Sequence, residues 1–207
     1  MKDQEYDYFY DDEQDAVYCY PGTNILKNKL NIRDIEVLHE AERDYSSVRQ
    51  AELTNRGVTG DFSFKHLCSI HKHLFQDIYT WAGKTRTVDI SQGTIFCLVQ
   101  FIEEQFDDLY RKLKKENFLA DITDKREMSV RLAFYLGELN MIHPFREGNG
   151  RTQRMYIEQL CQNNGRFEID FTEATKEEMI LASVQSANVS NDLLEALIYK
   201  CLVELVN

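Results

Sequence analysis

The chain has 207 residues, of which 43% are hydrophobic, and its net charge of −11 comes from 35 acidic and 24 basic side chains. This length and apolar content fit a single globular domain, and the acidic balance disfavours a nucleic-acid partner. No segment approaches the ~18–20 apolar residues that span a bilayer, and the N-terminal residues lack an apolar signal region, so we expect no membrane partner and a cytoplasmic location.

Residues 1–19 form an acidic and aromatic segment that we separate from a single domain over residues 20–207. Residues 1–15 hold seven acidic side chains against one base, Lys2, together with four aromatic side chains. Two interpretations stay open: a solubilising tail, or a segment that folds back over the domain or contacts a partner.

Apolar side chains recur at spacings of three and four through most of the domain, which predicts amphipathic helices. The stripes expected to face the core are Ile32, Ile35, Leu38, Ala41, Tyr45 and Val48; Phe64, Leu67, His71, Leu74 and Ile78; Ile102, Phe106, Leu109 and Leu113; Leu132, Tyr135, Leu136, Leu139 and Ile142; and Leu193, Leu194, Leu197, Ile198, Cys201, Leu202 and Leu205. Gly165 is typical of a helix C-cap, and Thr175 with Glu178 of a capping box. The sequence therefore predicts an all-α bundle.

Cys68, His71 and His73 share one of these helices, but they lack further ligands at metal-binding spacing. We interpret them as core residues. The five cysteines form no C-x-x-C pair, which favours reduced thiols over disulfides or zinc.

One segment, residues 85–97, breaks the helical pattern. Residues 86–91 alternate between apolar and polar side chains, Gln92 and Gly93 supply a turn, and residues 94–96 resume extended composition. This pattern predicts a short β-hairpin, which needs something to pack over because an isolated hairpin is marginally stable.

The run from His143 to Arg154 concentrates the groups that a nucleotide-polyphosphate site requires. Gly148 and Gly150 flank Asn149, so the backbone can turn its N–H groups toward an anion, and the helix that follows adds its own free N–H groups. Arg151 and Arg154 lie three residues apart on one face of that helix, where two cations are favourable only with an anionic ligand.

Other members of the run supply chemistry. Glu147 is a hard oxygen ligand placed to hold Mg²⁺ (or Mn²⁺) together with nucleotide phosphates. His143, at the C-terminal end of a helix that Pro144 terminates, can act as a general base toward an attacking hydroxyl. Phe145 is expected to anchor the loop in the core.

The run resembles the Fic-family signature, His-x-Phe-x-Asp/Glu-Gly-Asn-Gly-Arg-x-x-Arg, at every specified position. Residues 20–30 and 71–83 also look like the upstream segments of bacterial Fic proteins, so the resemblance covers roughly residues 20 to 200. It implies a Fic-fold helical bundle and the transfer of AMP from ATP to a Ser, Thr or Tyr hydroxyl of a target protein, with release of pyrophosphate. It also implies that the enzyme modifies itself. Transfer of another group such as UMP or phosphate, or a nucleotide-binding regulatory module without transfer, stays an alternative.

The same resemblance implies roles for individual residues. His143 resembles the base and Glu147 the metal ligand, while Gly148, Asn149 and Gly150 resemble the phosphate nest. Arg151 and Arg154 look like the residues that position the β- and γ-phosphates. Tyr156 is a candidate for the adenine pocket.

The expected hairpin looks like the family's flap, which covers the active site and adds the target segment as a strand. The residues of this target-docking flap are Val88, Asp89, Ile90, Ser91, Gln92 and Gly93. Gln92 stands where some relatives place a Lys, so we expect no lysine-dependent target contact.

Many Fic proteins carry a restraining helix, Ser/Thr-x-x-x-Glu-Gly/Asn, whose Glu pairs with the second signature arginine. The sole match to its Ser/Thr-x-x-x-Glu part runs from Thr123 to Glu127, is followed by Met128, and precedes the motif helix. We therefore expect Arg154 to have no such intramolecular partner. Either a small antitoxin supplies the Glu in trans, or the enzyme is constitutively active.

Overall fold

The structure is a computed structural model that describes residues 16–57, 59–91 and 95–205. The helices and strands of these residues are α2 (Ile35–Arg56), α3 (Phe64–Phe75), η1 (Val99–Phe101), α4 (Ile102–Lys115), η2 (Asn117–Leu119), α5 (Lys125–Ile142), α6 (Asn149–Asn164), β1 (Phe167–Ile169), η3 (Phe171–Glu173), α7 (Lys176–Asn188), α8 (Asp192–Cys201) and β2 (Leu202–Glu204). The predicted helical bundle is thus confirmed.

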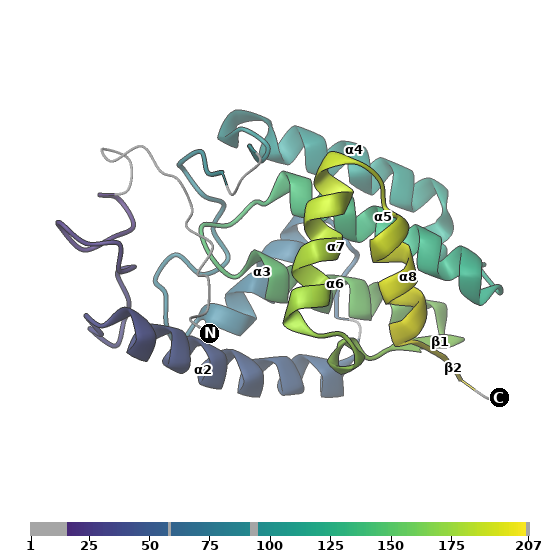
Figure 1. Cartoon of the computed structure of the whole chain (residues 1–207), viewed down its shortest axis with the longest axis horizontal. Helices are drawn as coiled ribbons and strands as arrows, with labels where there is room; N and C mark the ends of the chain where they lie inside the picture. Colours follow the sequence, from purple (N-terminus) through teal and green to yellow (C-terminus); the bar gives the residue numbers. More distant parts are fainter. Residues whose placement is uncertain (1–15, 58, 92–94, 206–207) are drawn as a thin grey trace.

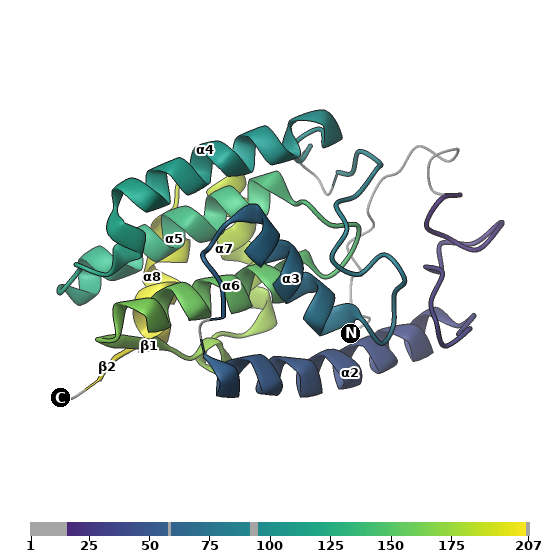
Figure 2. The same cartoon turned by 180° about the vertical axis from the view of Figure 1, so that it is seen from behind.

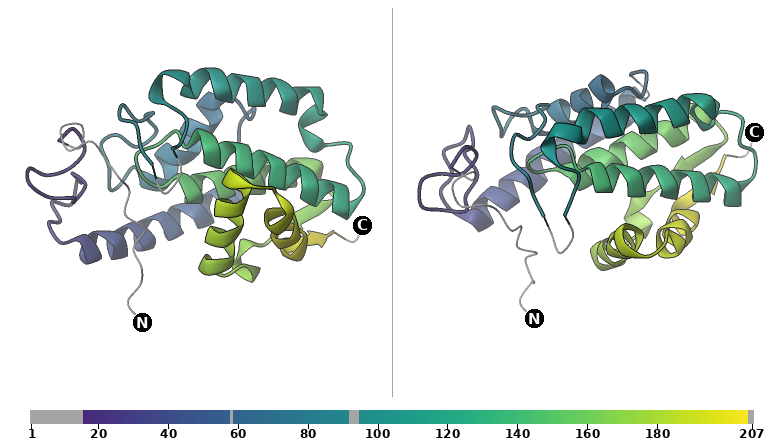
Figure 3. Two further views of the ribbon diagram at one scale, coloured as in Figure 1. Left: turned by 45° about the horizontal axis from the view of Figure 1, so that its top comes forward. Right: turned by 90° about the horizontal axis from the view of Figure 1, so that it is seen from above.

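Helix α6, which begins within the signature, lies at the centre of the bundle. It packs against α2, α3 and α5, while α7 and α8 form a pair that covers the outer side of α5 (Figure 1). The view from behind shows α3 crossing α6, with α2 along one edge and α4 along the other (Figure 2). Seen from above, α5 lies between α4 and the pair α7–α8 (Figure 3, right). The signature is therefore held from three sides.

Several expected features of the helices are confirmed. The predicted stripe of α4 is fully buried, as is that of α5; these residues are Ile102, Phe106, Leu109, Leu113, Leu132, Tyr135, Leu136, Leu139 and Ile142. Gly165 ends α6 with φ 72°, and Thr175 and Glu178 form the capping box of α7. Local periodicity and cap chemistry sufficed here because the same residues also face the core.

The expected core stripe of α2 is wrong over part of its length. Tyr45 and Val48 are 43% and 63% exposed. The buried residues of this helix are Leu38, Glu42, Ser46 and Leu53. Glu42 and Ser46 face inward because they contact Arg151 of α6 rather than an apolar side chain. The charge of Arg151 therefore decides which face of α2 is buried.

The expected final helix is also too long. Helix α8 ends at Cys201, and residues 202–204 form β2, which pairs antiparallel with β1 in the register Phe167–Glu204, Glu168–Val203 and Ile169–Leu202. Apolar spacing alone does not distinguish one more helical turn from a short strand, and the available ladder on β1 decides in favour of the strand.

The segment expected to form a β-hairpin has no assigned strand among its described residues, and residues 87 and 88 form a bend. Arg86, Val88 and Ile90 are buried while residues 87 and 89 are exposed, so the predicted alternation is confirmed. A single antiparallel bridge joins Ser91 to Ile95. Gln92 and Gly93, the expected turn, lie outside the described residues.

The expected acidic segment, residues 1–19, is described from residue 16 onward. Tyr18 and Cys19 are buried, and Cys19 forms an antiparallel bridge with Leu26. Within the described part of the chain, no helix combines the length and the apolar character needed to cross a membrane.

Candidate active site

His143 caps the C-terminus of α5 in the left-handed conformation, with φ 45° and ψ 60°. Its backbone N–H donates to the Leu139 carbonyl at 3.0 Å, and its ring stacks on Phe96 with centroids 3.8 Å apart. Nδ1 lies 3.1 Å from the Asn140 carbonyl, which can only accept, so Nδ1 carries the proton. Nε2 is therefore the basic nitrogen of the neutral ring.

Burial is the main reason why the pKa of His143 falls from its ordinary 6.5 to about 3, and the charge of Arg86 acts in the same direction. The ring is 5% exposed. An imidazole in this environment is neutral at physiological pH and available to accept a proton.

The loop after His143 is closed by Asn149 and opened to an anion by Gly148. The Asn149 amide bonds the Phe145 backbone twice, with Oδ1 accepting from N–H at 2.9 Å and Nδ2 donating to the carbonyl at 2.7 Å. Gly148 is the N-cap of α6 with φ 79°, and no side chain caps this helix. The N–H groups of its first turn thus face no capping oxygen, which suits an anionic ligand.

Close packing explains why residue 148 is glycine. A Cβ at this position would lie 2.3 Å from the Phe75 ring, and φ is positive. Gly150, in contrast, lies in the first turn of α6, where a Cβ would approach only the Arg154 side chain, at 3.3 Å. The sequence expectation of two glycines bending the loop therefore applies to Gly148.

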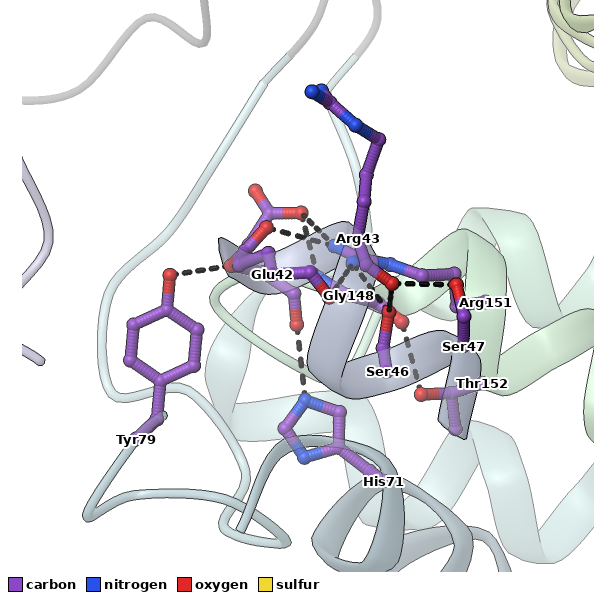
Figure 4. A network of polar contacts seen from close by, with 10 residues as sticks. Glu42, Arg43, Ser46, Ser47, His71, Tyr79, Gly148, Arg151 and Thr152 are labelled. Carbon is purple, nitrogen blue, oxygen red and sulfur yellow. Dashed lines mark hydrogen bonds and ion pairs between the residues drawn. The ribbon is translucent and has the colours of Figure 1, made fainter. Parts of the chain in front are cut away.

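Arg151 is held by one turn of α2 (Figure 4). Its guanidinium donates to Glu42 Oε2 at 2.9 Å, to Ser46 Oγ at 3.0 Å and to the Glu42 carbonyl at 3.3 Å. The Tyr79 hydroxyl donates to the other Glu42 oxygen. Burial acts to lower the pKa of Arg151, but Glu42 and Glu147 outweigh it and the pKa is raised. Arg151 stays charged.

Arg154 differs from Arg151, because none of the residues that the structure describes supplies it with a counter-ion. No hydrogen bond or ion pair of Arg154 is found among the described residues, and burial followed by repulsion from Arg151 lowers its pKa. An unneutralised guanidinium beside an uncapped helix N-terminus is a site for an anion.

Glu147 directly precedes Gly148, the N-cap of α6, and its carboxylate lies near Arg151. Its Oε1 accepts from the Gly148 N–H at 2.7 Å and lies 3.7 Å from Arg151 Nη2, and the side chain is 28% exposed. Burial, and then the negative charge of Glu42, raise the pKa of this carboxyl, while Arg151 opposes them.

The donor set near Glu147 bears on the metal. No group of three or more His, Cys, Asp or Glu side chains suited to a metal occurs among the described residues. A single partly exposed carboxylate fits Mg²⁺, which takes most of its ligands from phosphates and water.

His71 links α3 to the signature loop. Its Nδ1 accepts from the Gly83 N–H at 2.7 Å, so Nε2 carries the proton and donates to the Glu147 carbonyl at 3.0 Å. The ring stacks on Phe145, 3.9 Å between centroids, and burial lowers its pKa to about 3. Phe145 is 1% exposed and lies in the core.

Arg86 attaches the flap segment to the site. Its buried guanidinium donates to the carbonyls of His143 and Val88, both at 2.8 Å, and to that of Cys97. Asp89 Oδ1 lies 3.6 Å from it. The Arg86 side chain therefore joins Val88, Cys97 and the backbone of His143.

Tyr156 is buried and contacts aromatic side chains. The residue is 2% exposed, its hydroxyl donates to the Phe62 carbonyl at 2.6 Å, and its ring packs edge-on against Phe62. A role in the adenine pocket stays a prediction, and this burial argues against it.

Four residues of the site escaped the sequence reasoning: Glu42, Tyr79, His71 and Arg86. For Glu42 the spacing was ambiguous, because Leu38, Glu42 and Ser46 recur at helical spacing, but so do Leu38, Ala41 and Tyr45. His71 carried the opposite signal, since it sits in an apolar stripe. Nothing local marks Tyr79 or Arg86, whose partners are 37 and 57 residues away.

Comparison with known proteins gives one family. The model of the Fic/DOC family matches residues 61–161. The chain is 40% identical over 188 residues to protein adenylyltransferase VbhT of Bartonella schoenbuchensis. The matched region covers 90% of this chain and 39% of that protein. The chain is also 40% identical over 149 residues to the probable protein adenylyltransferase Fic of Escherichia coli, covering 72% of this chain and 73% of that protein.

Solved structures agree. The BepC protein of Bartonella tribocorum with bound AMPPNP superposes with a TM-score of 0.87 at 25% identity, covering 93% of this chain and 99% of that one. The N-terminal Fic domain of a Bartonella quintana effector with bound ADP gives a TM-score of 0.83 at 27% identity, covering 92% and 96%.

Proposed function

Because the chain belongs to the Fic/DOC family, we propose that it is a protein adenylyltransferase, which transfers AMP from ATP to a hydroxyl side chain of a target protein. The observation that carries this proposal is the juxtaposition of a neutral, buried His143 with an uncapped helix N-terminus and two arginines. Since the chain spans 39% of the length of VbhT, the proposal concerns the activity of this domain.

In this reaction the target hydroxyl oxygen attacks the α-phosphorus, a new P–O bond forms, and the bond to pyrophosphate breaks. His143 Nε2 takes the hydroxyl proton. The approach of the anionic phosphates acts to raise the pKa of His143 above about 3, which makes the ring a stronger base when substrate is bound.

The phosphates are positioned by charge and backbone N–H groups. The first turn of α6 faces them, Arg154 neutralises the outer phosphates because no acidic side chain among the described residues pairs with it, and Arg151 completes the cradle. We assign Glu147 as the residue that would hold Mg²⁺, and the metal would supply charge neutralisation between phosphate groups.

The flap segment is the proposed docking site for the target. Residues 86–91, which include a bend at residues 87 and 88, are tied to His143 through Arg86, so a target strand added along this segment would bring a hydroxyl near the base. Val88, Asp89, Ile90 and Ser91 are the described members of this site.

The proposal of regulation by a separate protein rests on the contacts of Arg154. Among described residues this side chain has no acidic partner, so a separate small antitoxin with a Ser/Thr-x-x-x-Glu helix could supply one. A synthetic peptide of that pattern should inhibit ATP turnover by wild type. Unchanged turnover would favour a constitutively active enzyme.

The test of the activity is intact mass spectrometry after incubation with ATP and Mg²⁺, in the presence of candidate target proteins. Wild type should add AMP to itself or to a target, and His143→Ala should not. His73→Ala is the matched control, because His73 Nε2 bonds Glu52 at 2.9 Å rather than the signature. Modification from UTP but not ATP would replace AMP transfer by UMP transfer, and binding of ATP without any adduct would indicate a regulatory module.

A further inference from the structure

Glu42 has a contact pattern that its position on a surface helix does not require. Its side chain is 6% exposed, and both carboxylate oxygens have partners: Arg151 on Oε2 and the Tyr79 hydroxyl on Oε1. A buried carboxylate is costly unless it is paired in this way. The arrangement therefore fixes both the charge and the rotamer of Glu42.

Arg151 lies between two carboxylates. Its Nη2 is 2.9 Å from Glu42 Oε2 and 3.7 Å from Glu147 Oε1. The Ser46 hydroxyl and the Glu42 carbonyl accept from its other terminal nitrogen, so three acceptors on α2 draw the guanidinium toward that helix. The contact with Glu147 stays longer than a hydrogen bond.

We propose that Glu42 is a positioning residue, which holds Arg151 against α2 and thereby leaves Glu147 available for the divalent cation. This inference rests on the proposed function of the site. Without the charge of Glu42, the nearest carboxylate for Arg151 is Glu147, and an ion pair between them would engage the carboxylate that would hold the cation.

Tyr79 supports the same arrangement from the other side. Its ring is 1% exposed and stacks on Trp81 with centroids 4.2 Å apart, so its hydroxyl is held in place. Burial, and then the charge of Glu42, raise the pKa of Tyr79, so the phenol stays a donor. Figure 4 shows the chain of contacts from Tyr79 through Glu42 to Arg151.

The test is nucleotide affinity of the purified chain, measured by calorimetry with ATP in the presence of Mg²⁺ and again in EDTA. Binding is measured independently of transfer. In Glu42→Gln the gain in ATP affinity that Mg²⁺ provides should shrink roughly tenfold, because a charge two contacts from the cation is lost and Glu147 is engaged by Arg151. Affinity in EDTA should be unchanged or tighter, since a negative charge beside the phosphates has been removed.

A merely structural role would give another result. Loss of packing would weaken ATP binding in both conditions together, or lower the fraction of active protein, without changing the effect of Mg²⁺. Glu116→Gln is the matched control, because Glu116 also pairs with a half-buried arginine, Arg131 at 2.9 Å from Oε2, but on α5. It should leave both affinities unchanged.

A second variant decides the question if Glu42→Gln does not fold. Tyr79→Phe keeps the ring and removes the hydroxyl that orients Glu42, so the Mg²⁺ effect should shrink in the same direction by roughly two- to threefold. If Glu42→Gln folds and its Mg²⁺ effect is unchanged, the inference about Glu42 is wrong but the proposed function is not affected. If Glu42→Gln does not fold, an unchanged Mg²⁺ effect in Tyr79→Phe has the same meaning. If wild type binds no nucleotide at all, the proposed function fails and the inference with it.

Discussion

Acidification should weaken the fold through His143, because the folded chain holds this imidazole neutral. Burial, with help from Arg86, lowers its pKa from 6.5 to about 3. Between these values the unfolded chain binds a proton that the folded chain excludes, so the unfolded state gains relative stability as the pH falls. The contribution of His143 to stability is thus complete above pH 6.5 and is lost progressively toward pH 3.

The magnitude follows from the distance in pH. At pH 5.0 the unfolded imidazole is roughly 1.5 pH units below its ordinary pKa, which corresponds to about 2 kcal/mol at 1.36 kcal/mol per pH unit. Other groups titrate in the same range: burial also lowers the pKa of His71, and it raises that of Glu147, which acts with the opposite sign. A comparison with His143→Ala cancels both.

The assay is urea unfolding of wild type and His143→Ala, followed by circular dichroism at pH 7.5 and pH 5.0. Wild type should lose about 2 kcal/mol more free energy of unfolding between these pH values than the variant does. Equal losses, within about 0.5 kcal/mol, would show that His143 is protonated in the folded chain, and the argument from burial would be wrong.

Three further predictions concern single side chains. Arg86→Met should lower the free energy of unfolding by about 3–5 kcal/mol in urea, because three backbone carbonyls lose their donor, and a loss below about 1 kcal/mol would contradict this account of the flap attachment. Gly148→Ala should destabilise the fold by about 2 kcal/mol or more in thermal unfolding, because the added Cβ would clash with Phe75. Gly22 has a similar φ but no atom near its Cβ position, so Gly22→Ala should cost only about 1 kcal/mol. Equal effects of the two substitutions would contradict the role of the clash. Arg154→Gln should weaken ATP binding at least about tenfold in calorimetry yet leave stability unchanged or higher, since the charge it removes has no counter-ion within the part of the chain that the structure describes. A marked loss of stability would reveal a structural partner.

The sequence by itself determined the helical elements whose apolar stripe and caps coincide with the core. The stripes of α4 and α5, the glycine that ends α6 and the capping box of α7 are local features, because each depends on residues three to four positions apart. The signature was readable for the same reason, since His143 to Arg154 fall within twelve consecutive residues. Their individual roles stay predictions.

Only the tertiary structure decided which polar residues support that signature. Arg151 meets Glu42, 109 residues away, and His143 meets Arg86, 57 residues away. Helical periodicity cannot rank Glu42 above the exposed Tyr45 on α2, because what turns that face inward is a charge on another helix. The conversion of residues 202–204 into β2 has the same origin, since a strand forms there only because β1 offers its ladder. Spacing along the chain fixes what a segment can form, and the partner brought to it by folding fixes which side it buries.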